Sequence, residues 1–390
     1  MRRRPISKIE PGTKLGSTLK IPSPHPDVHY KLKLDEGTVL TEKHLKRLNK
    51  LNISKVPVED SRTDDLDPFI YDKKVSEAED EVIEEFSELT TKFEKDSLSA
   101  KDVNRLNEAV DSLIEALKGS ELMAAFTTLK THDSYTARHS LDVAKIAIQL
   151  VLEFEEELKK QLHEESGASM QYIYNNMIQD LGVGAMLHDI GKRHVADNIL
   201  NKSAELNDEE WNKMQKHTVK GHSDLQQLNS SINAPVKVPS VQHHEKFDGS
   251  GYPRGLEGKD IHLFGRICAP ADVYSALTSS RPYREGKPPA VALEIMESMQ
   301  DEGPHFDPEI YEKFRKLVFP YPAGMEVTLS DGSQGVVCDV DEENPSQPTV
   351  RILSRNGSQL QQPVEVKVPN RPGELKITEP AVESDQLLTA

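Results

Sequence analysis

The chain has 390 residues, a formal net charge of −17 at pH 7, and 29% charged against 36% hydrophobic residues. This composition fits a globular protein of two or three domains, and the acidic balance argues against sequence-independent binding of DNA or RNA through phosphates. No apolar run approaches the roughly 18 residues of a membrane span, and two cysteines, Cys268 and Cys338, cannot build a disulfide framework. We therefore expect a cytoplasmic protein.

Residues 1–65 are predicted to form a small α/β module. Short strands are indicated at 13–21, 30–34 and 53–58, and Thr41 is placed to cap a short helix before the last of them. Nothing in this module suggests a catalytic group.

Residues 66–120 are predicted to form an amphipathic helical linker. Apolar side chains recur every three or four residues over 75–93 and again over 103–117. Ser99 and Asp102, between the two stripes, have the spacing of a capping box. Two interpretations remain equally open: a segment that dimerises or transmits a signal, and a helical hairpin packed on the next domain.

Residues 121–320 are strongly helical and hold most of the histidines, because only His25, His29 and His44 of the 14 lie elsewhere. After residue 320 the pattern changes to short alternating runs separated by turn pairs such as Asn-Gly. These runs predict a small β appendage at 321–378, followed by a tail at 379–390. The expected fold class is mainly α.

The strongest chemical signal is the adjacent pair His188 and Asp189. Neighbouring side chains on a helix point about 100° apart, so one metal could take the imidazole while the carboxylate bridges to a second ion. A single His-Asp pair is more often a hydrogen-bonded structural pair. Further candidate ligands accompany this one, namely His139, His217, His243, His244 and Asp272.

Each of these residues alone would more often be an ordinary core or surface residue. Together they supply imidazole and carboxylate ligands without thiolates, which suits iron, manganese or another borderline transition metal.

The order of these residues resembles the HD phosphohydrolase superfamily. The string HHEKFDGSGYP at 243–253 is similar to the HD-GYP family, and so are HDIGK at 188–192 and DVYSALTSSRPYR at 272–284. The resemblance covers about residues 125–315. It implies an HD-type helical bundle at 121–320 and hydrolysis of cyclic di-GMP to pGpG, and leaves open whether hydrolysis continues to GMP.

The resemblance also implies a binuclear site of iron or manganese. Two such ions about 3.5–4 Å apart could bind both oxygens of a phosphodiester and activate water. Asp189 would be shared between them. The first ion would also be held by His139, His188 and Asp272, and the second by His217, His243 and His244.

Lys192 and a basic loop are the implied catalytic and substrate contacts. Lys192 follows Asp189 by three residues, and the resemblance places its ammonium at the phosphate; otherwise it would be a lysine at a helix end. Arg281, Tyr283 and Arg284 would contact phosphate and guanine, with Tyr252 lining the same pocket. Without the resemblance this loop would be a solvated basic segment.

The resemblance implies cyclic di-GMP as the small-molecule partner. It also implies contact of the GYP loop, Gly251-Tyr252-Pro253, with GGDEF-type diguanylate cyclases. Two alternatives stay open: an HD phosphohydrolase for another cyclic dinucleotide, and a catalytically silent receptor. A missing ligand or lysine would favour the receptor, and none of those named above is missing.

Some HD-GYP enzymes are trinuclear and carry a glutamate four residues before the first histidine. Here that position is Tyr135, and His132 and Asp133 lie further from His139. A phenol, with a pKa of about 10, is a poor replacement for a carboxylate. We therefore expect two metals, with pGpG as the main product.

Overall fold

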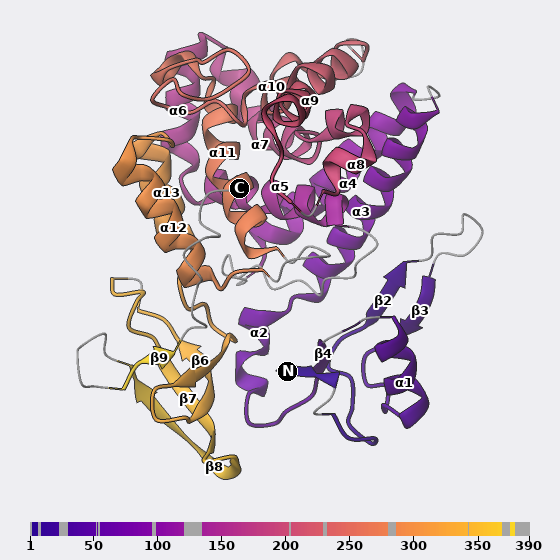
Figure 1. Ribbon diagram of the computed structural model, residues 1–390, viewed down its shortest axis with the longest axis vertical. Coiled ribbons are helices and arrows are strands. Elements are labelled where there is room, and N and C mark those ends of the chain that lie inside the picture. The colour runs from indigo at the N-terminus through magenta and orange to yellow at the C-terminus, as the bar shows by residue number, and fades with distance from the viewer. Residues whose placement is uncertain are drawn as a thin grey trace. The chain divides into compact units, whose positions relative to one another are not determined.

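The computed structural model describes residues 2–6, 9–22, 30–51, 53, 55–95, 99–120, 135–202, 204–228, 232–279, 286–341, 343–368 and 375–378. The fold is mainly α, as predicted, with a small antiparallel sheet near the end of the chain (Figure 1). The chain divides into two compact units. The described residues up to 72 and from 320 onward form one, and residues 73–120 and 136–319 form the other.

The first part of the first unit contains two strand pairs around a short helix. The pairs are β1 (Arg2–Pro5) with β4 (Lys55–Val58), and β2 (Leu19–Pro22) with β3 (Tyr30–Leu34), both antiparallel. The helix α1 (Glu42–Lys50) begins at the predicted cap, because the Thr41 hydroxyl accepts a hydrogen bond from the His44 N–H. The predicted strand at 13–21 is shorter in the structure, and β1 was not predicted.

The second part of this unit is a five-stranded antiparallel sheet in the order β8-β7-β6-β5-β9. The predicted Asn-Gly turn is formed by Asn356 and Gly357, between β7 and β8, with φ of 48° and 76°. The strands are β5 (Glu326–Leu329), β6 (Gln334–Asp339), β7 (Thr349–Arg355), β8 (Ser358–Lys367) and β9 (Ile377–Thr378).

The sheet is joined to the segment before the second unit. Arg351 on β7 donates two hydrogen bonds to the Asp65 carboxylate, at 2.6 and 2.7 Å. Leu66, in the short helix η2 (Asp64–Leu66), packs with Val336 and Leu353 of the sheet. The helix α2 (Asp67–Ile70) follows.

The second unit begins with the helical hairpin α3 (Lys73–Glu94) and α4 (Ala100–Lys118), in which Ser99 and Asp102 form the predicted capping box. The hairpin packs on α7 (Met170–Met186). A side chain at Gly182 of α7 would place its Cβ only 2.9 Å from Val110 of α4. The apolar stripe of α4 is therefore covered by α7 of the same chain. This contact favours the interpretation of residues 66–120 as a hairpin packed on the next domain.

The remaining helices of this unit include α5 (Tyr135–Glu153), α9 (Asp208–Gln226), α10 (Val238–Gln242) and α11 (Leu263–Thr278), which carry or directly precede predicted ligands. None of the described helices is long and apolar enough to cross a membrane. The other helices are α6 (Glu155–Ser166), η4 (Ile190–His194), α8 (Asp197–Leu200), η5 (Ala234–Lys237), η6 (Gly258–Asp260), α12 (Pro289–Glu302) and α13 (Pro308–Leu317).

Candidate metal centre

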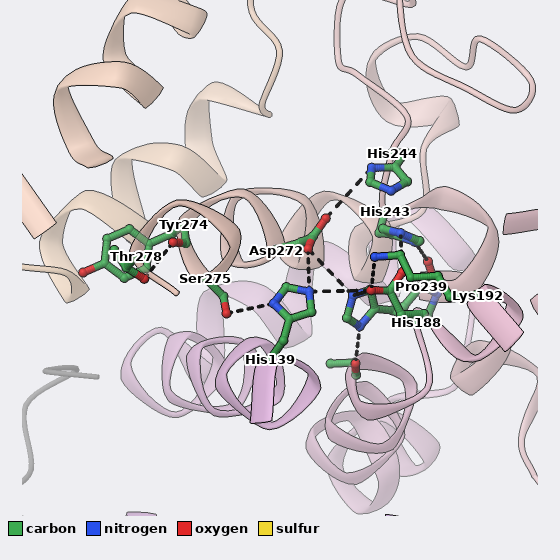
Figure 2. A network of polar contacts seen from close by, with 12 residues as sticks. His139, His188, Lys192, Pro239, His243, His244, Asp272, Tyr274, Ser275 and Thr278 are labelled. Atoms are coloured by element: carbon green, nitrogen blue, oxygen red, sulfur yellow. Dashed lines mark hydrogen bonds and ion pairs between the residues drawn. The ribbon is translucent and has the colours of Figure 1, made fainter. Parts of the chain in front are cut away.

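Five segments of the helical unit bring all the predicted metal ligands into one buried cluster. Figure 2 shows five of them, His139, His188, His243, His244 and Asp272. His188 and Asp189 lie just after the end of α7, and His243 and His244 lie just after the end of α10. The side chain of His244 is the most exposed of the set, at 26%. The other ligands come from the middle of helices: His139 from α5, His217 from α9 and Asp272 from α11.

The Asp189 carboxylate lies between two pairs of imidazoles. Its Oδ2 is 3.6 Å from Nε2 of His139 and 3.3 Å from Nε2 of His188. Its Oδ1 is 3.5 Å from Nε2 of His217 and 3.7 Å from Nε2 of His243. One oxygen therefore faces each pair, which is the arrangement that a carboxylate shared by two ions requires.

The second carboxylate, Asp272, closes the other side of the cluster. Its Oδ1 lies 3.0 Å from Nε2 of His139 and 3.8 Å from Nε2 of His188. Its Oδ2 lies 3.9 Å from Nδ1 of His244 (Figure 2). Asp272 thus contacts the first imidazole pair and also His244.

Backbone carbonyls fix the protonation of three imidazoles. Nδ1 of His188 donates to the carbonyl of Ala185 at 2.7 Å, Nδ1 of His217 to Met214 at 2.7 Å, and Nδ1 of His243 to Pro239 at 2.6 Å. Since a carbonyl can only accept, Nδ1 carries a proton in each ring, and in the neutral ring the lone pair then lies on Nε2, which faces the centre. Such outer hydrogen bonds are typical of metal-binding histidines.

Two buried atoms at the centre have no hydrogen-bond partner among the described residues. They are Nε2 of His188 and Oδ1 of Asp189. A buried acceptor without a partner lowers the stability of the fold by about 1–3 kcal/mol. A bound cation would remove this penalty at both atoms. Three groups of ligand atoms lie close enough together to hold a metal ion. They are His217, His243 and His244; His139, His188 and Asp189; and His188, His243 and Asp272. The residues present fit a metal site.

Burial keeps the second imidazole group neutral. It lowers the pKa of His217, lowers that of His243 well below the usual value, and lowers that of His244 to about 3. Neutral imidazole is the form that binds metals, so these side chains need not lose a proton near neutral pH.

The carboxylates, in contrast, stay ionised. Burial alone would raise the pKa of Asp189, but the charge of the Lys192 ammonium holds it well below the usual range. Burial likewise opposes ionisation of Asp272, and the hydrogen bond with His139 outweighs it. The cluster therefore presents two anionic groups among the imidazoles.

Lys192 reaches the shared carboxylate, although the α-helix that precedes it has ended. Its Nζ lies 2.6 Å from Oδ2 of Asp189. The segment η4 is a 3₁₀ turn, in which residues three apart lie on the same side. Lys192 is therefore at the centre and is not only a helix-end lysine.

Gly191 allows η4 to press against α9. A Cβ at this position would lie 2.0 Å from the carbonyl oxygen of His217 and 2.5 Å from the N–H nitrogen of Gly221. Any side chain at Gly191 would thus separate His188 and Asp189 from His217. This role of Gly191 was not predicted from the sequence, although the glycine within the string HDIGK could have indicated it.

The arginine after Lys192 ties η4 to the hairpin. Arg193 donates to Asp224 of α9 at 2.9 Å and to the carbonyl of Phe93 at 2.9 Å, and its guanidinium lies over the Phe93 ring. The helix α3 therefore contacts the segment that carries Lys192.

The GYP loop packs on the exposed end of the cluster. The Tyr252 ring stacks on His244, with centroids 4.7 Å apart. The buried carboxylate of Glu245 accepts from the backbone N–H groups of Arg254 and Leu256, at 2.9 and 3.0 Å, and so holds the loop closed. Sequence reasoning missed Glu245, whose signal was its place directly after the histidine pair.

Some predicted residues cannot be placed. Arg281, Tyr283 and Arg284 lie outside the described residues, as do His132 and Asp133. Tyr135 opens α5, one turn before His139. The number of metals and the basic-loop contacts stay predictions.

Comparison with known proteins gives a consistent result. Residues 153–310 match the HD domain family. The chain is 32% identical over 280 residues to a cyclic di-GMP phosphodiesterase of Pseudomonas aeruginosa, covering 69% of this chain and 63% of that protein. It is 34% identical over 210 residues to a cyclic di-GMP phosphodiesterase of Thermotoga maritima, covering 54% of this chain and 50% of that protein.

A third similarity involves a different dinucleotide. A 3′3′-cGAMP-specific phosphodiesterase of Vibrio cholerae is 42% identical over 127 residues, which cover 32% of this chain and 24% of that protein. The chain thus spans less than two thirds of the length of each of these relatives.

Proposed function

Because the chain belongs to the HD-GYP family of HD-domain proteins, we propose that it is a metal-dependent phosphodiesterase that hydrolyses cyclic di-GMP. One observation carries the proposal: the two oxygens of Asp189 face two separate imidazole pairs, and one of those oxygens is buried without a partner. Such a site can hold two cations side by side against a phosphodiester.

The two ions would be iron or manganese, given the imidazole and carboxylate ligands. When bound, they would polarise the phosphodiester and lower the pKa of the attacking water. Asp189 would serve both. His139, His188 and Asp272 would complete the first set of ligands, and His217, His243 and His244 the second.

Lys192 is the proposed catalytic side chain. Its ammonium lies at the same carboxylate oxygen that faces His139 and His188, so it is within reach of a phosphate held there. There it would stabilise negative charge on phosphate in the transition state or assist the departing 3′ oxygen. Lys192→Ala should therefore lower turnover while elemental analysis finds metal content near that of the native chain.

The substrate would be gripped outside the cluster. Arg281 and Arg284 are proposed to bind phosphate, because guanidinium matches its oxygens bidentately. Tyr283 and Tyr252 are proposed to line the pocket for the bases. Homodimerisation through residues 74–118, contact of the GYP loop with a GGDEF-type cyclase, a cytoplasmic location and pGpG as the main product are further predictions.

Separation of reaction products tests the proposal. The full chain, loaded with manganese or iron, is incubated in separate reactions with cyclic di-GMP and with 3′3′-cGAMP, and the nucleotides are resolved by chromatography. We expect cyclic di-GMP to be converted to pGpG, and Asp189→Asn to convert it at least about a thousandfold more slowly.

Two outcomes would contradict this expectation. Faster hydrolysis of 3′3′-cGAMP than of cyclic di-GMP would make 3′3′-cGAMP the preferred substrate. The similar Vibrio cholerae protein is specific for that dinucleotide. Tight binding of cyclic di-GMP without consumption of either compound would make the chain a receptor.

A further inference from the structure

A row of aromatic rings leads from the metal ligands to the protein surface. Centroids lie 4.0 Å apart between His243 and His244, 4.7 Å between His244 and Tyr252, and 6.0 Å between Tyr252 and Trp211. Exposure rises from 2% at His243 to 41% at Trp211. Trp211 is therefore the solvent-facing end of a row that begins at the centre.

Trp211 has a more exposed aromatic ring than Tyr252, which is only partly exposed. The Tyr252 ring is stacked on His244 with an interplanar angle of 29°, and burial raises the pKa of its phenol. Tyr174 is also an exposed aromatic side chain, at 48%, but it donates a hydrogen bond to Glu156 and lies beneath the Lys159 ammonium. Among the described aromatic residues, Trp211 combines large exposure with contact to the GYP loop.

The helix that carries Trp211 also holds a metal ligand and is fixed at its start. The backbone N–H of Trp211 donates to the carbonyl of Asn207 at 2.8 Å, and Asn207 forms a reciprocal capping box with Glu210. Lys202 donates to the Glu210 carboxylate at 2.5 Å. Since His217 lies on the same helix, the backbone that carries the indole is fixed relative to the cluster.

We propose that Trp211 stacks on a purine base of the cyclic dinucleotide whose phosphate lies at the metal ligands, and that it thereby contributes to substrate recognition. The inference rests on the proposed function. Stacking of bases on aromatic side chains tolerates different purines, because each base has a π face. Trp211 would thus strengthen binding of purine dinucleotides in general and leave the choice between them to polar groups.

Kinetics of a variant series test the role in binding. Trp211→Ala should raise the KM for cyclic di-GMP about tenfold and change kcat less than twofold, because a stacking contact binds ground state and transition state alike. Trp211→Phe should restore most of the affinity. Tyr174→Ala, which removes another exposed aromatic ring, is the matched control and should leave both constants unchanged.

Fluorescence provides a readout that does not depend on turnover. Trp211 is the one tryptophan of the chain, so its emission reports on this position alone. Rapid mixing of the metal-loaded full chain with cyclic di-GMP should quench that emission within the first turnover, saturably in cyclic di-GMP.

The outcomes separate this inference from the proposed function. Hydrolysis with unchanged emission and an unchanged KM for Trp211→Ala would overturn the role of Trp211 and leave the enzyme in place. Saturable quenching without hydrolysis would uphold Trp211 and overturn the enzyme. A lower melting temperature for Trp211→Ala with native KM would show that the indole only packs on Tyr252, which also overturns the inference.

Discussion

The helical unit buries two clusters of charged side chains, which differ in what balances their charge. At the metal centre, Asp189 and Asp272 are ionised, and two ligand atoms are buried without a partner. In the other cluster the Arg266 guanidinium donates to Asp307, to Glu165 and to the carbonyl of Ile261. There the protein itself supplies the cation.

This difference distinguishes a ligand site from a structural ion pair. In the Arg266 cluster each carboxylate meets a donor of fixed geometry, and Asp307 also caps α13 by accepting from the Glu309 N–H. At the metal centre Asp189 lies beside three imidazoles, those of His188, His217 and His243, whose Nδ1 protons point away to backbone carbonyls. A buried group of acceptors with too few donors is therefore the feature that indicates a missing cation.

The largest expected effect is at the shared carboxylate. Asp189→Asn should lower hydrolysis at least about a thousandfold, since it weakens the sites of both ions, each of which stabilises the transition state by several kcal/mol. Elemental analysis should find metal content reduced in the same variant, with the helical circular dichroism retained. Native metal content would show that the buried acceptor at this position serves another purpose.

The matching change in the other cluster should affect stability alone. Arg266→Met leaves Asp307 buried without its cation, which costs about 3–5 kcal/mol. Urea denaturation measures this loss, and metal content per folded chain should be unchanged. If Arg266→Met lost its metals, the two clusters would be coupled and the comparison between them would fail.

Acid should also weaken the region around Arg266. Burial, with the charge of Arg266, lowers the pKa of His262 to about 4. The unfolded chain takes up this proton near pH 6.5, before the folded one does, so stability is lost as the pH falls from about 6.5 to 4, by about 3 kcal/mol at most.

Replacement of His262 isolates this contribution. His262 caps α11 by accepting from the Phe264 N–H, and asparagine is also a good cap. His262→Asn should therefore keep the helix and show a shallower loss of stability in the same pH interval, measured by denaturation at several pH values. Equal slopes would exclude His262 as the titrating group.

The smallest expected effect sharpens the description of the metal centre. The Ser275 hydroxyl lies 3.0 Å from Nδ1 of His139 and orients that ligand. Ser275→Ala should weaken metal affinity or activity about 10- to 100-fold. Thr278→Val, one turn further along α11, is the control, because the Thr278 hydroxyl bonds to the Tyr274 carbonyl of its own helix (Figure 2).

That these candidate ligands cluster was predictable, because few side chains bind metals and their order along the chain is distinctive. Their role as ligands stays a prediction. Their outer partners were not predictable. Ser275 is an ordinary helical serine until the fold places it beside His139, and the carbonyls that orient three imidazoles leave no trace in the sequence. Glu245 follows the histidine pair, but its role depends on two N–H groups about ten residues further along.

The fold shows the same division between local and distant contacts. Capping at Thr41 and at Ser99, and the turn at Asn356 and Gly357, follow from short-range chemistry and were predicted. The bond between Arg351 and Asp65 joins residues 286 positions apart. Sequence patterns give no register for such a pairing, so the union of the first and last parts of the chain was not predicted.

The contact of Arg193 with Phe93 has a practical consequence for the catalytic helices. The α3–α4 hairpin also covers Gly182 with Val110, and Glu79 on α3 accepts a hydrogen bond from the buried Lys145 of α5. A fragment that begins at residue 121 would remove the Glu79 partner of this lysine and leave the covered face of α7 in water. The hairpin is therefore part of the cooperative unit that unfolds with the metal centre, and hydrogen exchange should show both protected to a similar degree.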